Sequence, residues 1–380
     1  MAVPQFKEIR RSYGFDEVAI VPGQVTINPE QADMSMSIGD LKFDIPVMAS
    51  AMDAIVSPSF AIQMGRKGGI AVLNLEGLWT RYQDAEDKLA EVAETPLEQA
   101  TALLQSLYTA PIQEELIAQR VHEIKAGDVK CAVAVTPQKA KRFAPIAVEA
   151  GADMLVVQST VTTAKHISKS YHGLVFSELV EQIKIPVVVG NCVGYDVALE
   201  LMENGIQGLL VGIGPGAACT SREVVGIGVP QVTATMDCAA AREEYLHRTG
   251  RYVSVITDGG IRTGGDVCKS FVAGADGVMI GTPFAQAAEA PGRGHNWGMA
   301  TPDPALPRGT RISVGIKGTL QEVLFGPSSR TDGTMNLTGA LRACMGMVGA
   351  FNLRELQQTE LIYAPDIKAE GKIYQIAQGR

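Results

Sequence analysis

The chain has 380 residues, of which 46% are hydrophobic and 19% are charged. This composition excludes a disordered chain, and the length allows one large domain with a sizeable core. The 33 basic residues are outnumbered by 41 acidic ones, which argues against a nucleic-acid partner. No run reaches the about 18 apolar residues of a membrane span, the start has no signal-peptide core, and the six cysteines show no paired spacing. We therefore expect a cytoplasmic protein without a membrane partner.

The predicted elements alternate between short β-branched runs and amphipathic segments of helix length. Residues 1–44 precede this alternation as an amino-terminal extension, and within them YGFDEVAIVPG predicts a strand that ends in a Pro-Gly turn. The apolar runs then follow at 45–50, 70–75, 129–135, 154–159, 185–191, 208–213, 253–260 and 277–282. Near-continuous apolar strands that alternate with helices indicate a parallel sheet covered by helices. Eight such units predict the α/β fold class, as a (β/α)8 TIM barrel rather than an open doubly wound sheet.

Two long segments interrupt the alternation. Residues 78–127, before the third strand, contain Glu/Ala/Leu-rich stretches that predict helices, and we interpret them as a helical insertion rather than an independent domain. Residues 291–336 follow the eighth strand and are rich in Gly, Pro, Thr and Arg. A long irregular segment at this place is typical of a functional flap or a disordered loop. The whole of residues 1–380 is thus expected to form a single barrel domain.

A glycine-rich loop with a cysteine follows the sixth strand. Barrel active sites are built at the carboxyl ends of the strands, so the residues after each apolar run are the informative ones. The segment GIGPGAACTSR, residues 212–222, places three glycines before Cys219 and puts Arg222 three residues after it. A nearby cation raises the thiolate fraction of a cysteine, so this pattern favours a nucleophile. The alternative is a small buried cysteine in a tight turn.

The residues after the seventh and eighth strands indicate a phosphate site. They read DGGIR (258–262) and GTPFAQAAEA (281–290), where Thr282 suits a helix N-cap and Pro283 the first helical position. The free N–H groups of such a helix attract phosphate, and Gly260 and Gly281 would let it approach the backbone. Asp258 beside a phosphate makes sense if it binds sugar hydroxyls, so we expect a nucleotide or a sugar phosphate. The alternative is that these glycines simply close turns.

These segments together resemble the IMP dehydrogenase / GMP reductase superfamily. GIGPGAACTSR resembles its cysteine loop, and DGGIR with GVMIGT resembles its phosphate segment. The segments FDEVAIVP (15–22), ASAMD (49–53), GN (190–191), WGMA (297–300) and KG (317–318) follow in the order of the family. The usual dehydrogenase carries a pair of regulatory CBS modules where this chain has only residues 78–127. The chain therefore most resembles the short IMP dehydrogenase-related branch that lacks them.

The resemblance implies a role for individual residues. Cys219 would add to C2 of IMP, and a hydride would leave from C2 to NAD. Hydrolysis of the resulting adduct would give XMP for guanine nucleotide biosynthesis. Ser221 would lie beside the reacting carbon. The residues implied to bind the substrate are Ser50, Asn191, Asp258, Gly260, Gly281, Thr282, Met299 and Ala300. The residues implied on the cofactor side are Gln158, Ser159 and Gly212. Backbone carbonyls of Gly214, Gly216 and Cys219 would hold K⁺, and the family implies a homotetramer.

Three departures from the family pattern concern the nucleotide sites. Gln158 stands where the dehydrogenases have an Asp that accepts from a ribose diol, which leaves open whether the cofactor is NAD or NADP. Ala217 replaces a phosphate-binding serine, and Leu210 replaces a basic residue.

The flap after the eighth strand departs most. Only eleven residues separate Asn296 from Arg308, and no Arg-Tyr pair lies there to activate water. Asp303, Arg308 or Arg311 could replace the missing base, but the spacing selects none of them. General-base assistance is worth roughly 10²–10⁴-fold, so we expect a dehydrogenase with slow turnover. The alternatives are a GMP reductase that uses NADPH, a silent purine-nucleotide-binding regulator, and a dehydrogenase for another purine nucleotide.

Overall fold

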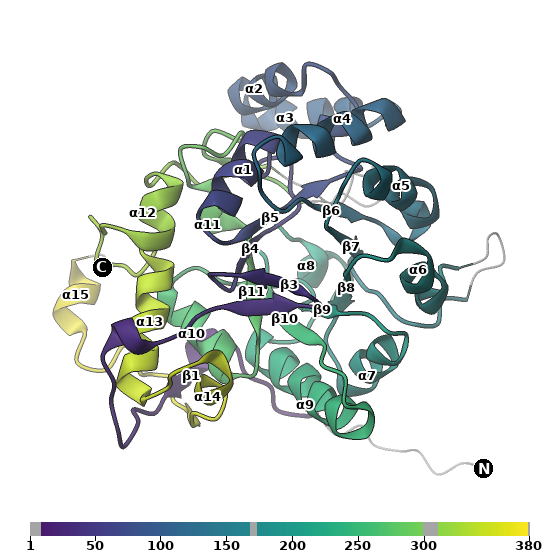
Figure 1. Ribbon diagram of the computed structural model, residues 1–380. Coiled ribbons are helices and arrows are strands. Elements are labelled where there is room, and N and C mark those ends of the chain that lie inside the picture. Colours follow the sequence, from purple (N-terminus) through teal and green to yellow (C-terminus); the bar gives the residue numbers. More distant parts are fainter. Residues whose placement is uncertain (1–8, 168–172, 299–310, 379–380) are drawn as a thin grey trace, which may run out of the picture.

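Eight parallel strands close into a barrel at the centre of the molecule (Figure 1). The structure is a computed structural model that describes residues 9–167, 173–298 and 311–378. The hydrogen-bonded order of the strands is β10-β11-β4-β5-β6-β7-β8-β9. Their bounds are β4 Val47–Ala49, β5 Ile70–Asn74, β6 Ala132–Val135, β7 Met154–Gln158, β8 Val187–Cys192, β9 Gly208–Val211, β10 Ser254–Asp258 and β11 Gly277–Ile280. Each coincides with one of the predicted apolar runs, so the predicted (β/α)8 fold is confirmed.

Helices cover the outside of the barrel because each presents one apolar stripe to the strands. In α6, for example, Phe176, Leu179 and Ile183 are buried along one face. The first barrel helix, α1, begins at a local signal, since the Ser57 hydroxyl accepts from the backbone N of Phe60 at 3.0 Å and Pro58 follows it. The bounds are α1 Pro58–Arg66, α4 Glu114–Lys125, α5 Pro137–Glu149, α6 Phe176–Ile183, α7 Tyr195–Glu203, α9 Gln231–Thr249 and α10 Gly264–Val272.

The amino-terminal extension covers the end of the barrel opposite the expected site. The hairpin of β2 (Met36–Ile38) and β3 (Leu41–Phe43) reaches the starts of the strands, where the hydroxyl of Ser254 donates to the carbonyl of Ser37 at 2.6 Å. The strand predicted within YGFDEVAIVPG is β1 (Val18–Ile20), which pairs with β14 (Leu361–Tyr363) outside the barrel. Single-turn 3₁₀ helices occur at Phe15–Glu17, Pro29–Gln31 and Leu78–Thr80. With the amino-terminal ends closed, the carboxyl ends remain for a ligand.

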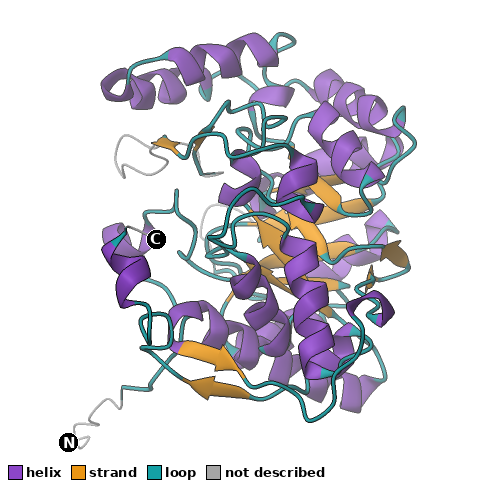
Figure 2. Cartoon of the chain, turned by 90° about the vertical axis from the view of Figure 1, so that its left-hand side faces the viewer, coloured by secondary structure: helices purple, strands orange, loops and turns teal. Residues whose placement is uncertain are grey.

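The helical stretches predicted in residues 78–127 divide into two groups. Helices α2 (Ala85–Glu94) and α3 (Leu97–Leu107) stand outside the ring of barrel helices (Figures 1 and 2). Helix α4 instead packs between α1 and α5 and covers the barrel. We use the name insertion for α2, α3 and the turn through Tyr108.

The chain after β11 is more regular than its composition suggests. Residues 291–336 contain a short hairpin, β12 (His295–Asn296) with β13 (Ile312–Ser313), and the helix α12 (Leu320–Phe325). Helix α12 opens with a reciprocal capping box, because the backbone N of Glu322 donates to the Thr319 hydroxyl at 3.2 Å and the backbone N of Thr319 donates to the Glu322 carboxylate at 2.7 Å. The remaining helices are α11 Thr282–Ala285, α13 Leu337–Val348, α14 Leu353–Leu356 and α15 Ile373–Ala377.

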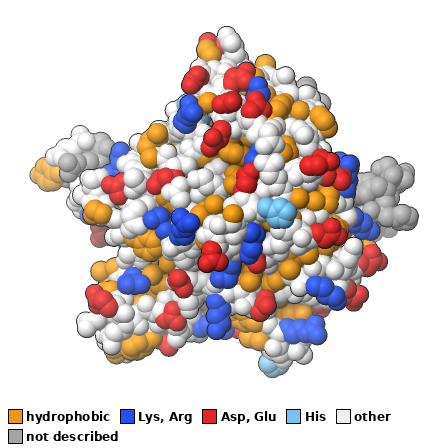
Figure 3. Space-filling model, turned by 45° about the horizontal axis from the view of Figure 1, so that its top comes forward, with side chains coloured by type: hydrophobic (Ala, Val, Ile, Leu, Met, Phe, Trp, Pro, Cys, Tyr) orange, Lys and Arg blue, Asp and Glu red, His pale blue; other side chains and the backbone are white. Residues whose placement is uncertain are grey.

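Acidic and basic side chains are interspersed over the face seen in Figure 3. No helix among the described residues is long and apolar enough to span a membrane.

Candidate active site

A cavity of about 560 Å³ opens at the carboxyl ends of the barrel strands. This volume lies in the range of small-molecule sites, and the position is the one that TIM-barrel enzymes use. The cavity is lined by every predicted site residue that the structure describes, namely Ser50, Gln158, Ser159, Asn191, Gly212, Gly214, Gly216, Cys219, Ser221, Asp258, Gly260, Gly281 and Thr282. The predicted residues Met299 and Ala300, and the candidate bases Asp303 and Arg308, lie outside the described residues.

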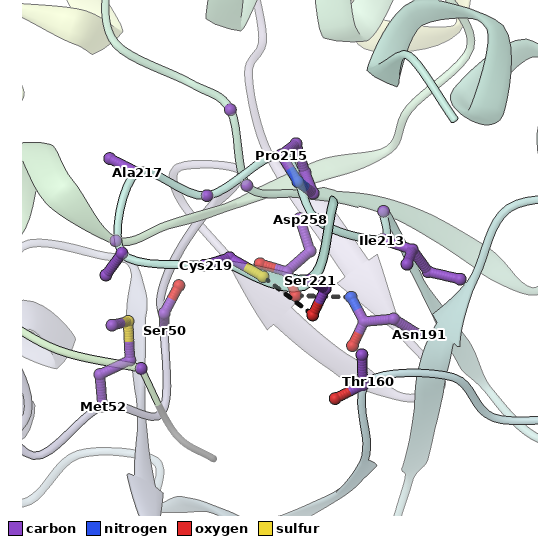
Figure 4. A pocket seen from close by; sticks show the side chains of 18 of the residues that line it. Ser50, Met52, Thr160, Asn191, Ile213, Pro215, Ala217, Cys219, Ser221 and Asp258 are labelled. Atoms are coloured by element: carbon purple, nitrogen blue, oxygen red, sulfur yellow. Dashed lines mark hydrogen bonds between the residues drawn. The ribbon is translucent and has the colours of Figure 1, made fainter. Parts of the chain in front are cut away.

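Cys219 lies on the loop between β9 and the short helix α8 (Ser221–Val225), and its side chain is half-buried at the cavity (Figure 4). Its Sγ donates to the hydroxyl of Ser221 at 3.4 Å, and its backbone N donates to the carbonyl of Gly216 at 3.0 Å. The loop needs glycine where it leaves the strand: Gly212 has φ +147°, and a Cβ there would lie 2.2 Å from the carbonyl oxygen of Asp258. The glycine pattern therefore sets the path that presents the thiol.

Arg222 braces this loop. Its guanidinium donates to the carbonyl of Val229 at 2.8 Å and to that of Ile213 at 3.3 and 3.4 Å. Its side chain occupies the space beside Gly214 and Gly228, where an added Cβ would approach it to 2.6 Å. The sequence suggested that this cation acts on the thiol; in the structure its hydrogen bonds hold the two ends of the loop together.

A half-buried carboxylate, that of Asp258, lines the same cavity as Cys219. Asp258, at the end of β10, accepts at Oδ2 from Nδ2 of Asn191 at 2.8 Å and from Nε2 of Gln158 at 3.0 Å. Burial raises the pKa of Asp258 to about 6, and the two amide hydrogen bonds oppose that rise. A ligand that offers hydroxyl donors to this carboxylate would stabilise its charged form.

Gln158 connects two polar side chains of the cavity wall, Asn191 and Asp258. Its Nε2 also donates to Oδ1 of Asn191 at 3.1 Å, so the amide nitrogen serves two partners. Its Oε1 is buried and accepts from no group among the described residues. A buried acceptor of this kind needs a donor, and it therefore fits a ligand with an amide or hydroxyl group. The hydroxyl-bearing Ser159 and Thr160 follow it along the same wall.

The predicted phosphate side lies between the ends of β10 and β11. Gly260 has φ +77°, as a tight turn toward the cavity requires. The expected helix start is displaced by one residue, because the carbonyl of Gly281 accepts from the backbone N of Phe284 at 3.0 Å. Gly281 is thus the N-cap and Thr282 the first helical residue, so the predicted N-cap role of Thr282 is wrong.

Two arginine side chains considered for the site, Arg262 and Arg311, make ion pairs or hydrogen bonds with other parts of the protein. The guanidinium of Arg262 is paired with Asp16 at 2.7 Å and with Asp266 at 3.2 Å. Arg311, a candidate base from the sequence, is buried and donates to the backbone carbonyl of Val92. The Arg262 guanidinium is thus paired with carboxylates, and Arg311 has a structural role.

Several residues of the cavity wall were missed by the sequence reasoning. Thr136 and Thr160 line the cavity directly after predicted strands, so the rule of reading the residues after each run applies to them as well. Asn296 is only 1% exposed, and its Oδ1 has no partner in the part of the chain that the structure describes. The pairing of β12 with β13 brings Asn296 to the cavity wall. The spacing of residues in the sequence did not predict that pairing. Met52 and Gly298 complete this wall.

Comparisons with known proteins show the family to which this chain belongs. Residues 12–300 match the IMP dehydrogenase / GMP reductase domain family. A protein from Mycolicibacterium smegmatis named as an uncharacterized oxidoreductase is 41% identical over 361 residues, which cover 93% of this chain and 96% of that protein. Inosine-5'-monophosphate dehydrogenase of Cryptosporidium parvum is 27% identical over 394 residues, covering 92% and 91%.

A solved structure agrees as well. That of an IMP dehydrogenase/GMP reductase-like protein from Corynebacterium glutamicum superposes with a TM-score of 0.89 at 36% identity, over 96% of this chain and 97% of that one. The similarity to these relatives therefore extends over almost the whole length of each chain. The chain belongs to the IMP dehydrogenase / GMP reductase domain family.

Proposed function

We propose that the protein is an oxidoreductase that converts IMP to XMP with NAD through a covalent adduct on Cys219. One observation carries this proposal: the thiol of Cys219, the carboxylate of Asp258 and the glycine backbone at Gly260 and Gly281 line the same cavity. These groups supply a nucleophile, an acceptor for sugar hydroxyls and donors for a phosphate. A purine nucleotide is the ligand class that needs all three, and the family match supports it.

The proposed binding mode follows the walls of the cavity. The phosphate of IMP would accept from the backbone around Gly260, Gly281 and Thr282, with Ser50 beside it, and the ribose hydroxyls would donate to Asp258. The purine would then extend toward Cys219 and Asn191. The family pattern adds the backbone of 299–300 at the edge of the base. Anchoring both phosphate and ribose fixes C2 of the purine near the thiol, which supplies the orientation that the reaction requires.

The proposed chemistry has two stages. The Cys219 thiolate forms a bond to C2, and the hydrogen at C2 departs with its electron pair, so the purine is oxidised by two electrons. NAD, when bound, supplies the acceptor for that hydride, and Gln158 Oε1 with the hydroxyls of Ser159 and Thr160 would hold it. Water then adds to C2, and the carbon–sulfur bond breaks to release XMP and restore the thiolate. Ser221, 3.4 Å from Sγ, would orient the water or the thiolate.

The second stage is expected to be slow. Arg311 donates to the carbonyl of Val92 in the insertion and is therefore not free to act as a base. The other candidate bases, at 303 and 308, lie outside the described residues. Loss of a general base lowers a rate by roughly 10²–10⁴-fold without preventing the reaction. We therefore infer that hydrolysis of the adduct limits turnover.

The family also suggests K⁺ at the cysteine loop and a homotetramer in the cytoplasm. The carbonyl of Gly216 accepts one hydrogen bond from the Cys219 backbone and keeps a second lone pair for a cation. The carbonyls of Gly214 and Cys219 would complete the protein ligands. Activity in K⁺ well above that in Na⁺ would support this site.

The test of the proposed function is a stopped-flow experiment in which IMP and NAD are mixed with the protein in potassium buffer. We expect an NADH burst close to the enzyme concentration, a slower steady rate, and a Cys219–purine adduct by mass spectrometry. A burst without steady turnover would mean that hydride transfer occurs and hydrolysis fails. Absence of burst and adduct would refute the proposal. GMP with NADPH would then test the reductase, and IMP binding without an adduct would identify a silent regulator.

A change at Gln158 tests its link to Asp258. Gln158→Glu keeps the size of the side chain but places a second carboxylate against Oδ2 of Asp258, from which Nε2 is now 3.0 Å away. Like charges this close raise the pKa of one partner by more than about one unit. We expect the pH at which IMP affinity is half-maximal to move upward by that amount, measured by titration calorimetry from about pH 5 to about pH 9, the range that brackets the expected shift. Gln207→Glu, at a partly buried amide directly before β9 and outside the cavity lining, is the matched control for introduced charge, since its Nε2 donates to the carbonyl of Gly205 at 2.7 Å; equal shifts in both variants would contradict the link.

A further inference from the structure

A buried chain of hydrogen bonds connects the insertion with two walls of the cavity. Tyr108, directly after α3, donates its hydroxyl proton to Oδ2 of Asp53. Trp297 donates from Nε1 to the hydroxyl oxygen of Tyr108 at 3.1 Å. The same Oδ2 of Asp53 accepts from the backbone N of Leu78 at 2.8 Å. The side chains of Asp53, Tyr108 and Trp297 are all buried, so these hydrogen bonds are shielded from water.

The two residues that end this series of hydrogen bonds, Asp53 and Trp297, are both next in sequence to residues of the cavity wall. Asp53 directly follows Met52, which lines the cavity after β4. Trp297 lies between Asn296 and Gly298, which line it from the β12 side. Tyr108 itself is not among the lining residues. Its hydroxyl therefore sits behind the junction of two walls that are far apart in sequence.

The insertion also holds both strands of the β12–β13 hairpin. Next to β13, Arg311 donates to the carbonyl of Val92, near the carboxyl end of α2, where helix carbonyls attract a cation. Ahead of β12, Arg293 pairs with Glu94 at 3.4 Å. Figure 2 shows the short strands next to the insertion helices. The hairpin is thus fixed from outside the barrel by three separate contacts, and the Trp297–Tyr108 bond joins two fully buried side chains.

Directional hydrogen bonds add to apolar packing at this junction, since Tyr108 and Trp297 also belong to the hydrophobic core. An apolar side chain at 108 would fill the same volume but would set neither the rotation of the Trp297 indole nor the orientation of the Asp53 carboxylate. Burial raises the pKa of Tyr108 well above its usual value, so the hydroxyl keeps its proton and remains the donor to Asp53. A buried network of this kind favours one arrangement of the groups it joins.

We propose that Tyr108 is a positioning residue for the nucleotide cavity, acting through Trp297 and Asp53. The insertion thereby sets the distance between the wall of Met52 and the wall of Asn296 and Gly298. This inference rests on the proposed function in one respect, since the ligand that these walls face is taken to be IMP.

The test removes one oxygen atom, the hydroxyl oxygen of Tyr108, from the full-length protein. Tyr108→Phe removes two hydrogen bonds, one to Asp53 and one from Trp297. Neither bond contacts the nucleotide, so only part of their free energy should appear in binding, and we expect the Kd of IMP to rise roughly three- to tenfold and the KM in proportion. The burst rate at saturating IMP should stay within about twofold, since Cys219 is untouched. Tyr82→Phe is the matched control: the Tyr82 hydroxyl, on the turn before α2, donates to the carbonyl of Leu107 at 3.0 Å and does not face the cavity. It should leave the Kd unchanged.

Two further measurements keep the proposal falsifiable. Trp297→Phe breaks the same bond from the donor side, so the double variant should bind IMP no more weakly than the weaker of the two single variants. Hydrogen exchange of the backbone amides at 295–298 should be faster in Tyr108→Phe than in Tyr82→Phe, with or without nucleotide. If wild-type protein binds no IMP, the proposed function fails while the exchange experiment still tests the positioning. Unchanged exchange, or equal losses of IMP affinity in Tyr108→Phe and Tyr82→Phe, would overturn it.

Discussion

Replacing Cys219 by alanine is expected to abolish NADH formation, with the rate falling by at least about 10⁴-fold, the scale seen when a covalent nucleophile is removed. The reason is that a thiolate is a far stronger nucleophile than the hydroxyls beside it on the loop, Thr220 and Ser221, and that Arg222 is held by backbone carbonyls. Stopped-flow absorbance should show neither burst nor steady rate, and mass spectrometry no adduct.

The matched control for this variant is Cys344→Ala. Cys344 is also only partly buried, but it lies on α13, outside the cavity lining. It should retain the wild-type burst and adduct. IMP affinity of the Cys219→Ala protein should stay within a few-fold of wild type, since the phosphate and ribose contacts are unchanged. Residual adduct formation in Cys219→Ala would show that another group is the nucleophile.

Replacing Asp258 by asparagine is expected to weaken IMP binding by roughly 10²–10⁴-fold, because hydrogen bonds to a charged acceptor contribute about 1.5–3 kcal/mol each and two ribose hydroxyls are involved. The new amide is nearly isosteric, but its neutral oxygen must also serve Asn191 and Gln158, which now donate to the carboxylate. Titration calorimetry with IMP measures the loss. Inosine 5'-monophosphate lacking both ribose hydroxyls is the ligand control, and it should bind wild type and variant with similar affinity.

The same carboxylate predicts how binding depends on pH. Burial raises the pKa of Asp258 to about 6, and in the proposed complex the hydroxyl donors of IMP would stabilise the charged form. IMP affinity should therefore be highest above about pH 6 and should fall by up to about tenfold per pH unit below it. In Asp258→Asn the affinity should change less across this range, because only the phosphate of IMP, whose second pKa is also about 6, still titrates there. If the IMP affinity of the wild-type protein did not change between about pH 5 and about pH 7, Asp258 would not be the group that binds the ribose.

Local sequence determined most of the fold. The strands are continuous apolar runs because both faces of a parallel barrel strand are buried, as all six residues of Val187–Cys192 show. The glycines at 212 and 260 were readable for a similar reason, since positive φ is a local requirement. The capping box of Thr319 and Glu322 was equally local, and it shows that composition alone understated the order in residues 291–336.

The partners of the polar side chains were decided by tertiary structure alone. The sequence placed Gln158 beside a cofactor and Arg222 beside a thiol; the barrel brings Gln158 to Asp258, 100 residues away, and turns Arg222 to loop carbonyls. The link between Tyr108 and Trp297 spans 189 residues and leaves no trace in any spacing. The physical reason is that backbone conformation depends on neighbouring residues, whereas a side-chain hydrogen bond depends on which strand ends and helices the closed barrel places together.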